Sequence, residues 1–344
     1  MASTKAWAAP RLPSWAWPTS PTTMTRSSQS CTGRSVFSEA SVDRPADPGE
    51  TTRQARIAAL GFDYADQLVE PVGACNLCGH RRPVEAARRD RYGYPATLVV
   101  CRRCGLGRLS PRMTAAAYAA FYARTYRPLV SAYHGRRIDA ETVQVEQRAY
   151  AATLGAFLEP LLASPPAEIL DVGGSTGVVA GALAQRFGAR ATVVDPSPDE
   201  LAVARAAGME TVLGFAEDLD PGGRRWGLVL LCQTIDHLLD ARATLAAMRA
   251  MTAPGGRAFV DILDVGVLLE RGSGIEALAK IDHPYYFTRP TALAIFAQAG
   301  YTTVGERLTE DGHRGFVLEP GPSTEPDWAS LEASAARFKA GRSR

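Results

Sequence analysis

The stretch Ile169-Leu-Asp-Val-Gly-Gly-Ser-Thr-Gly177 decides the fold of this chain. Its apolar first half predicts a buried strand, and residues 178–187 after it predict a helix. Gly173 and Gly174 let the backbone pass close to a ligand, because they carry no Cβ. In open α/β sheets, ligands bind beyond the carboxyl ends of the strands. The stretch therefore predicts a binding turn, with Asp171 at the end of the strand to accept a hydrogen bond from an ammonium group.

Strands and helices alternate after this turn. Further strands are expected at residues 191–194, 211–213, 228–232, 258–262, 301–304 and 315–318. Helices are expected at residues 199–207, 241–251 and 291–299, with an irregular insertion at 263–288. This alternation predicts an α/β fold with a doubly wound, mostly parallel sheet.

The glycine turn does not carry the fingerprints of the common nucleotide-binding loops. Ser175 or Thr176 stands where G-x-G-x-x-G requires its second glycine, and G-x-x-x-x-G-K-[ST] is absent. Asp195 ends the second strand, where a carboxylate suits a bidentate grip on two ribose hydroxyls. A dehydrogenase, or a tight turn without a ligand, remains an alternative at this point.

Taken together, residues 168–318 resemble the class I S-adenosylmethionine-dependent methyltransferases. The turn matches the D/E-x-G-x-G-x-G loop of that family, with Ser175 in place of the middle glycine. The segment 226–240 looks like the family's fourth-strand motif, although Gly227 replaces the usual Asp, and 252–257 looks like its "LkPGG" turn. The resemblance implies a Rossmann-like, seven-stranded sheet and S-adenosylmethionine as cofactor. The cofactor contacts that it implies are Asp171, Gly173, Gly174, Ser175, Gly177, Asp195 (ribose), Glu217 and Asp218 (adenine side) and Gln233.

Length and composition set the wider frame. The chain has 344 residues, of which 46% are hydrophobic, and a formal net charge of +2. This length suggests about two domains, and no apolar run is long enough to span a membrane. We expect a disordered tail at 1–55, a zinc ribbon at 56–112, a helical connector at 113–165, the methyltransferase domain at 166–320 and a tail at 321–344. We expect a cytoplasmic protein without a membrane partner.

Two C-x-x-C-G segments carry four of the six cysteines. Cys75, Cys78, Cys101 and Cys104 have the spacing at which four thiolates surround one Zn²⁺, and the glycine after each pair permits a tight turn. A closed four-sulfur site leaves no open position, so the zinc is expected to be structural. A redox dithiol and a relic site without metal are the alternatives.

The zinc ribbon in front of a methyltransferase core narrows the resemblance. The combination is similar to bacterial methyltransferases with an N-terminal zinc-binding domain, among them the sugar C-methyltransferases. This implies an acceptor that is a sugar or a nucleotide-linked sugar. Those enzymes carry a further α/β domain, whereas only a short stretch follows Leu318 here. Methylation of carbon, oxygen or nitrogen therefore stays open.

Residues 80–127 contain eleven arginines but only two acidic residues, Glu85 and Asp90. Such a concentration of charge indicates an anionic partner. A nucleotide-sugar diphosphate fits, since arginine pairs bidentately with phosphate. RNA fits as well, and so does no partner at all, if the arginines are merely solvated.

Two segments offer a base for removing a proton from the acceptor. His237 follows Asp236 after the fourth strand, near the expected sulfonium. His283 follows Asp282 in a segment that resembles the "E-H-x-x-x-F-s" segment of sugar C-methyltransferases, in which an acid–His pair is the base. We take His283, Asp282 and His237 as catalytic candidates, with a structural or substrate-orienting role as the alternative.

The leading hypothesis is S-adenosylmethionine-dependent methylation of a small, anionic, sugar-containing acceptor. The second hypothesis is an RNA methyltransferase that binds RNA through its arginine-rich zinc ribbon. A binding module with a vestigial cofactor fold is the third, and the intact Asp171 and Asp195 count against it.

Overall fold

The computed structural model describes residues 48–138, 140–216, 219 and 221–340. The expected tail at 1–55 is too long, because helix α1 (Pro48–Ala58) begins within it. Ile57 of this helix is buried, and Arg56 Nε donates to the Ala132 carbonyl oxygen at 2.7 Å, so packing against a later helix holds the segment in place.

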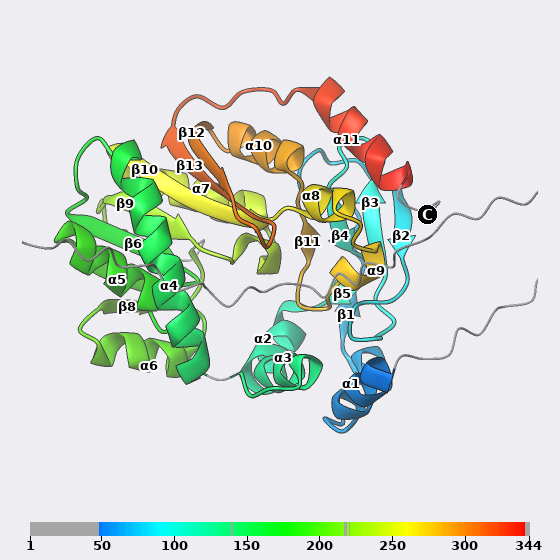
Figure 1. The fold of residues 1–344 in the computed structure, drawn as a ribbon. Helices are drawn as coiled ribbons and strands as arrows, with labels where there is room; N and C mark the ends of the chain where they lie inside the picture. Colours follow the sequence, from blue (N-terminus) through cyan, green and yellow to red (C-terminus); the bar gives the residue numbers. More distant parts are fainter. Residues whose placement is uncertain (1–47, 139, 217–218, 220, 341–344) are drawn as a thin grey trace, which may run out of the picture.

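Seven strands form the large sheet, in the order β12-β13-β10-β9-β6-β7-β8 (Figure 1). Their bounds are β6 (Glu168–Val172), β7 (Arg190–Asp195), β8 (Glu210–Leu213), β9 (Trp226–Leu231), β10 (Thr252–Leu263), β12 (Tyr301–Leu308) and β13 (His313–Pro320). All neighbours pair in parallel except β13, which is antiparallel to both β10 and β12. The doubly wound α/β fold and all seven expected strands are confirmed.

Alternate residues of the central strands feed two separate cores, as the two-residue period of a strand requires. On one face, Ile169, Leu228 and Phe259 pack with α4 (Ala140–Leu158) and α5 (Val178–Phe187). On the other face, the adjacent strand residues pack against α7 (Ala241–Met251) and α10 (Arg289–Gln298). Helix α6 (Pro198–Ala206) lies over β7 and β8. The cofactor loop, between β6 and α5, therefore sits on a rigid base.

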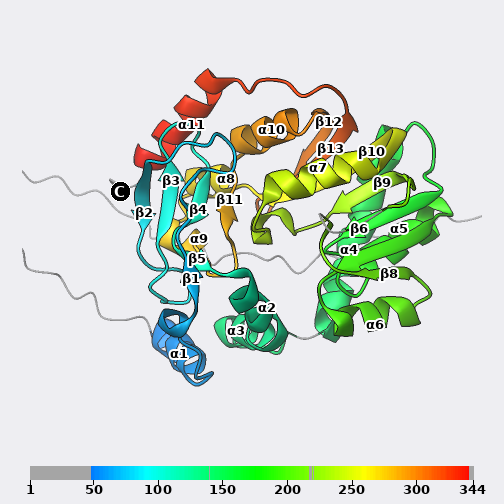
Figure 2. The same ribbon diagram turned by 180° about the vertical axis from the view of Figure 1, so that it is seen from behind.

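A second sheet, of four strands, lies beside the first in both views (Figures 1 and 2). Three of its strands come from the cysteine-rich region: β2 (Pro83–Ala87), β3 (Leu98–Cys101) and β4 (Gly107–Leu109). The fourth is β11 (Tyr285–Tyr286), from the insertion after β10, which also forms α8 (Val265–Glu270) and α9 (Ile275–Leu278). The part of the chain that forms the large sheet thus contributes a strand to the sheet of the cysteine-rich module.

The remaining elements close the space between these sheets. Strands β1 (Val69–Glu70) and β5 (Arg112–Met113) pair, and α2 (Ala115–Arg124) begins after its N-cap Thr114. Helix α3 (Tyr126–His134) follows directly. Helix α11 (Trp328–Ala340) packs on the cysteine-rich module, so the expected C-terminal tail contains a docked helix. None of the helices in the described residues has the length and apolarity that crossing a bilayer would demand.

Candidate cofactor and catalytic site

The turn after β6 has the conformation that its glycines predict. Gly173 and Gly177 adopt φ of +69° and +74°, in the left-handed region, and Gly173 N–H donates to the Val194 carbonyl oxygen at 2.7 Å. Ser175 shares this region with φ +52°. The loop thus folds back on the end of β7, which brings it to Asp195.

Asp195 holds this loop in place through hydrogen bonds to its carboxylate. Its Oδ2 accepts the Ser175 N–H at 3.0 Å, and its Oδ1 accepts the Ser197 N–H at 2.8 Å. Burial raises the pKa of Asp195, while these two backbone hydrogen bonds oppose the rise. Ser175, which stands in place of the family's middle glycine, donates its hydroxyl to Glu200 Oε2 at 2.5 Å. The departure from the motif is therefore accommodated by a hydrogen bond.

Asp171 is the carboxylate expected to receive an ammonium group. It is buried, and its Oδ1 has no hydrogen-bond partner in the described part of the chain. Burial, followed by the nearby charge of Asp195, raises the pKa of Asp171 to about 7. An arriving cation would favour the ionised form and satisfy this oxygen. These residues fit the amino-acid end of S-adenosylmethionine.

Replacing Gly174 by alanine is expected to disrupt this loop. A Cβ at Gly174 would lie 2.7 Å from Cγ and Oδ2 of Asp171, which is closer than packed atoms allow. Asp171 is buried and cannot swing away, so the overpacking should cost about 1–3 kcal/mol and displace the carboxylate. Calorimetric titration should show S-adenosylmethionine affinity falling at least tenfold. Gly181→Ala is the control, since its Cβ would meet only Met209, at 3.5 Å. Equal affinity in the two variants would contradict the expectation.

Three other implied cofactor residues have different outcomes. Glu217 and Asp218 lie outside the described residues. Gln233 is exposed directly after β9, with φ +51°, and its N–H donates to Asp261 Oδ1 at 2.5 Å. Thr234, the next residue, lies against the cofactor turn, because a Cβ on Gly173 would be 2.6 Å from its Cγ2. The segment after β9 therefore borders the loop as the resemblance implies.

His237 follows on the short 3-10 helix Ile235–His237 and is fixed by its surroundings. Its Nδ1 lies 2.8 Å from the Asp282 carbonyl oxygen and 2.8 Å from the Tyr122 hydroxyl, which itself donates to the same carbonyl at 3.0 Å. Since a carbonyl oxygen only accepts, Nδ1 of His237 carries the proton and Nε2 holds the lone pair. Burial lowers the pKa of His237, so the ring is a neutral base.

His283 packs edge-on against His237, with ring centroids 4.5 Å apart. The expected acid–His pair is not hydrogen-bonded, because Asp282 Oδ2 lies 3.6 Å from Nε2 of His283. Nε2 instead lies 3.2 Å from Nζ of Lys280. Burial lowers the pKa of His283 well below its ordinary value. The structure thus brings the three predicted catalytic residues together, but it pairs the imidazole with a lysine.

Sequence reasoning missed two members of this cluster. Lys280 and Tyr122 belong to no motif that could have marked them. Ligand atoms of His237, Asp282 and His283 lie within 4.8 Å of one another. We do not assign a metal there, because the amine of Lys280 lies 3.2 Å from Nε2 of His283 and Nδ1 of His237 is already hydrogen-bonded. The cluster is a hydrogen-bonded acid–base network.

The cysteine-rich module holds the loop that carries this network. Asp90 Oδ2 accepts the Ile281 N–H at 3.0 Å, and Arg91 N–H donates to the Ala279 carbonyl oxygen at 2.9 Å. The Tyr286 hydroxyl bonds both the N–H and the carbonyl oxygen of Lys280, each at 2.8 Å. Residues 279–286 therefore lack an independent fold and depend on the neighbouring module.

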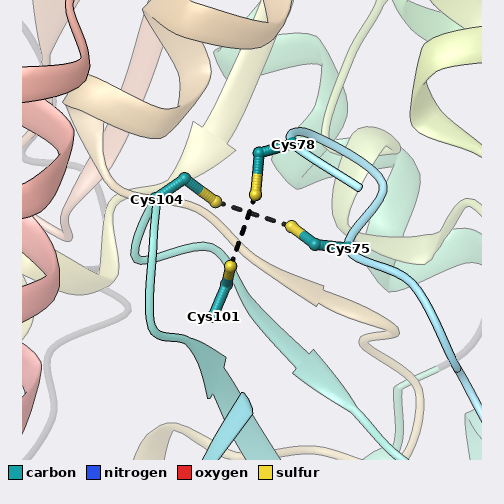
Figure 3. Close-up of side chains that lie close together, drawn as sticks. All are labelled: Cys75, Cys78, Cys101 and Cys104. Atoms are coloured by element: carbon teal, nitrogen blue, oxygen red, sulfur yellow. Dashed lines mark hydrogen bonds between the residues drawn. The ribbon is translucent and has the colours of Figure 1, made fainter. Parts of the chain in front are cut away.

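The four cysteines converge at one point in that module (Figure 3). The Sγ atoms of Cys75 and Cys104 are 3.5 Å apart, those of Cys78 and Cys101 are 3.4 Å apart, and all four lie within 4.8 Å of one another. Sulfurs around a tetrahedral zinc at 2.3 Å are separated by about 3.8 Å. Hydrogen bonding to Cys101 raises the pKa of Cys104, whereas hydrogen bonding to Cys104 lowers the pKa of Cys101, because the thiols share their protons. The donor set fits zinc.

The arginines of residues 80–127 do not form one basic face. Arg108 is buried, Arg112 donates to Glu70 and to the Leu239 carbonyl oxygen, and Arg127 lies 3.8 Å from Glu200. Seven remain exposed: Arg81, Arg82, Arg88, Arg89, Arg102, Arg103 and Arg124. Some of the arginines in this segment therefore make contacts within the protein.

The geometry defines an α/β domain with a glycine-rich turn and a cluster of titratable side chains at the carboxyl edge of its sheet. Residues 144–306 match the model of a methyltransferase domain family, and this region is a class I S-adenosylmethionine-dependent methyltransferase domain.

Curated relatives and a solved structure are similar to parts of this chain. The ubiquinone biosynthesis O-methyltransferase of Methylocella silvestris is 32% identical over 102 residues, which cover 28% of this chain and 40% of that protein. The enzyme of the same name from Cereibacter sphaeroides is 31% identical over 126 residues, which cover 35% and 49%. This chain thus spans less than half the length of these relatives. The magnesium protoporphyrin IX methyltransferase of Synechocystis, with bound SAH, has a TM-score of 0.41 and 14% identity, covering 53% of this chain and 88% of that one.

Proposed function

We propose that this chain transfers a methyl group from S-adenosylmethionine to a small-molecule acceptor. One observation supports this most directly: the loop built on Asp171 and Asp195 borders the segment that leads to His237. Bound S-adenosylmethionine supplies an electrophilic methyl group. The chain's own part is to place the acceptor beside it and to take up the acceptor's proton.

The site residues divide into two roles in this proposal. Asp171, the glycine turn and Asp195 hold the cofactor, with Asp195 on the ribose hydroxyls and Gln233 at the rim. His283 and His237 are the candidate bases, both neutral and both held by fixed partners. Asp282 acts mainly through its backbone, since its carbonyl oxygen fixes the tautomer of His237.

The proposed acceptor is a sugar or a nucleotide-linked sugar. This rests on the resemblance to zinc-ribbon methyltransferases that act on sugars, together with the exposed arginines. The names of the curated relatives make a phenolic acceptor the alternative within the same reaction class. Methylation of RNA is the alternative outside the class of small molecules, and it would use the seven exposed arginines.

We also propose that the four cysteines hold one structural zinc ion. The close approach of the four sulfur atoms, which fits a tetrahedral zinc site, supports this proposal. All four positions would be filled by protein, so the ion would have no role at the acceptor.

Titration with S-adenosylmethionine of the wild type and of Asp195→Ala tests the cofactor site. We expect micromolar binding that weakens about 10- to 100-fold in the variant, which loses charge-assisted hydrogen bonds. Asp199→Ala, in the first turn of α6, is the control. Radiolabelled methyl transfer to UDP-glucose, dTDP-glucose, catechol and total RNA then separates the acceptor classes. A folded wild type that does not bind S-adenosylmethionine would refute the proposed function.

A further inference from the structure

Lysine is almost absent from this chain. Among its 38 lysines and arginines only three are lysines, at positions 5, 280 and 339, and the other 35 are arginines. Where a positive charge is enough, this sequence therefore uses arginine. Lys280 is the one lysine whose side chain the structure describes, and it lies within the acid–base cluster. A lysine differs from an arginine chiefly because its amine gives up a proton readily.

The contacts of His283 form a path for a proton. Nε2 lies 3.2 Å from Nζ of Lys280. Within the described part of the chain, Nδ1 of His283 makes no hydrogen bond to protein. An imidazole that receives a proton at one nitrogen releases one from the other. The ring therefore connects this nitrogen with the amine of Lys280.

We infer that Lys280 is the final proton acceptor of the reaction, reached through the imidazole of His283. This inference rests on the proposed methyl transfer. The acceptor heteroatom forms a bond to the methyl carbon, and the carbon–sulfur bond breaks with its electron pair left on sulfur, giving S-adenosylhomocysteine. The acceptor's proton binds Nδ1 of His283, and the Nε2 proton moves to the neutral amine. His283 ends neutral and Lys280 ends as an ammonium group, which later loses its proton to solvent.

The surroundings of Lys280 let its amine lose its proton at a lower pH than an ordinary lysine does. Burial, and then the charge of Arg91, lower the pKa of Lys280 to about 8, against opposition from Asp282 and Asp236. A base works best when its pKa lies near the working pH, which His283 alone does not offer. The charged and titratable groups that face this pair are Arg91 of the ribbon loop, Asp282 beside it, Asp236 and His237 after β9, and His313 on β13.

The backbone of Lys280 is fixed independently of its amine. Its N–H and carbonyl oxygen both bond the Tyr286 hydroxyl, so substitution of the side chain leaves these bonds in place. Lys280→Arg keeps a positive charge of similar reach but cannot release a proton, whereas Lys280→Met removes the charge. The two variants together separate a proton acceptor from a mere counter-charge.

The first test needs no acceptor. Protein labelled with carbon-13 at lysine Cε gives three NMR signals, and Lys280→Arg identifies that of Lys280. We expect this signal to titrate near pH 8, with the other two near 10.4. His283→Gln should shift the Lys280 midpoint and leave the others unchanged. A Lys280 midpoint at 10 or above, or one that is insensitive to His283→Gln, would overturn the inference.

The second test uses whichever compound of the four-member panel the wild type methylates. Lys280→Arg and Lys280→Met should both lower kcat about 100-fold or more, with S-adenosylmethionine affinity unchanged. The wild-type kcat should rise with pH to a plateau above about 8, because the amine must be neutral, and this rise should vanish in the variants. Full activity of Lys280→Arg would overturn the inference. Absence of cofactor binding by the wild type would instead refute the proposed function, while the NMR titration still decides the state of Lys280.

Discussion

Replacing Cys101 by serine is expected to remove both the bound zinc and the methyl transfer. The turn that contains Cys75 and Cys78 is hydrogen-bonded directly to the methyltransferase domain. Asn76, which lies between Cys75 and Cys78, donates to Asp240 at 2.9 Å and accepts the Arg242 N–H at 3.2 Å, at the start of α7. Folding free energy from a structural zinc is about 10 kcal/mol or more in small domains. Its loss should therefore unfold the module that supports residues 279–286.

Four measurements check this expectation. Zinc content by atomic emission should fall from one ion per chain to near zero, and acceptor methylation should fall at least 100-fold. Hydrogen exchange should speed up in residues 279–286 but not in β7, and S-adenosylmethionine should still bind. Cys232→Ser is the matched control, because this cysteine lies outside the four-sulfur cluster. Unchanged exchange in residues 279–286 after zinc loss would contradict the proposed dependence.

Local patterns made the sheet and the cofactor turn predictable. Each strand is a short apolar run between turn residues, and the period of such a run is visible without knowledge of its neighbours. The turn at Gly173 and the carboxylate at Asp195 are set by the two strands that they end. The cysteine cluster was predictable for a similar reason, since each C-x-x-C-G turn is a local structure.

The contacts that hold residues 279–286, the loop with Lys280 and His283, were not predictable from these patterns. Strand β11 has only two residues, and its pairing with β4 joins positions that are far apart in the sequence. The hydrogen bond from Ile281 to Asp90 spans 191 positions. The hydrophobic pattern of a short segment gives no information about such long-range contacts. The internal contacts of the arginines were not predictable for a related reason, because a sequence gives the charge of Arg108 but not its burial.

Replacing Asp90 by alanine is expected to weaken both stability and methyl transfer, although Asp90 contacts neither histidine. Its Oδ1 accepts the N–H groups of Tyr92 and Tyr94, at 3.0 and 2.9 Å, and its Oδ2 accepts that of Ile281 at 3.0 Å. Asp90 is 4% exposed, so water cannot replace the carboxylate. An unsatisfied buried donor costs about 1–3 kcal/mol, so three of them should lower the free energy of unfolding by about 3 kcal/mol or more.

The loss of activity should exceed the effect of stability alone, because one of the three donors belongs to the loop that carries Lys280 and His283. Urea unfolding gives the stability, and kcat at a temperature where each variant is folded gives the activity. Asp90→Asn keeps an oxygen that accepts the N–H groups of Tyr92 and Tyr94, but it presents an NH₂ group to the Ile281 N–H. This variant should therefore retain more of its stability than of its activity.

Asp63→Ala is the matched control. This exposed carboxylate accepts the Ala65 N–H at 2.9 Å but does not contact residues 279–286, so its loss should cost about 1 kcal/mol of stability with kcat unchanged. If Asp90→Ala lost stability but kept its kcat, the ribbon would merely cover residues 279–286, and the acid–base cluster would hold its geometry through Tyr122 and Tyr286 alone.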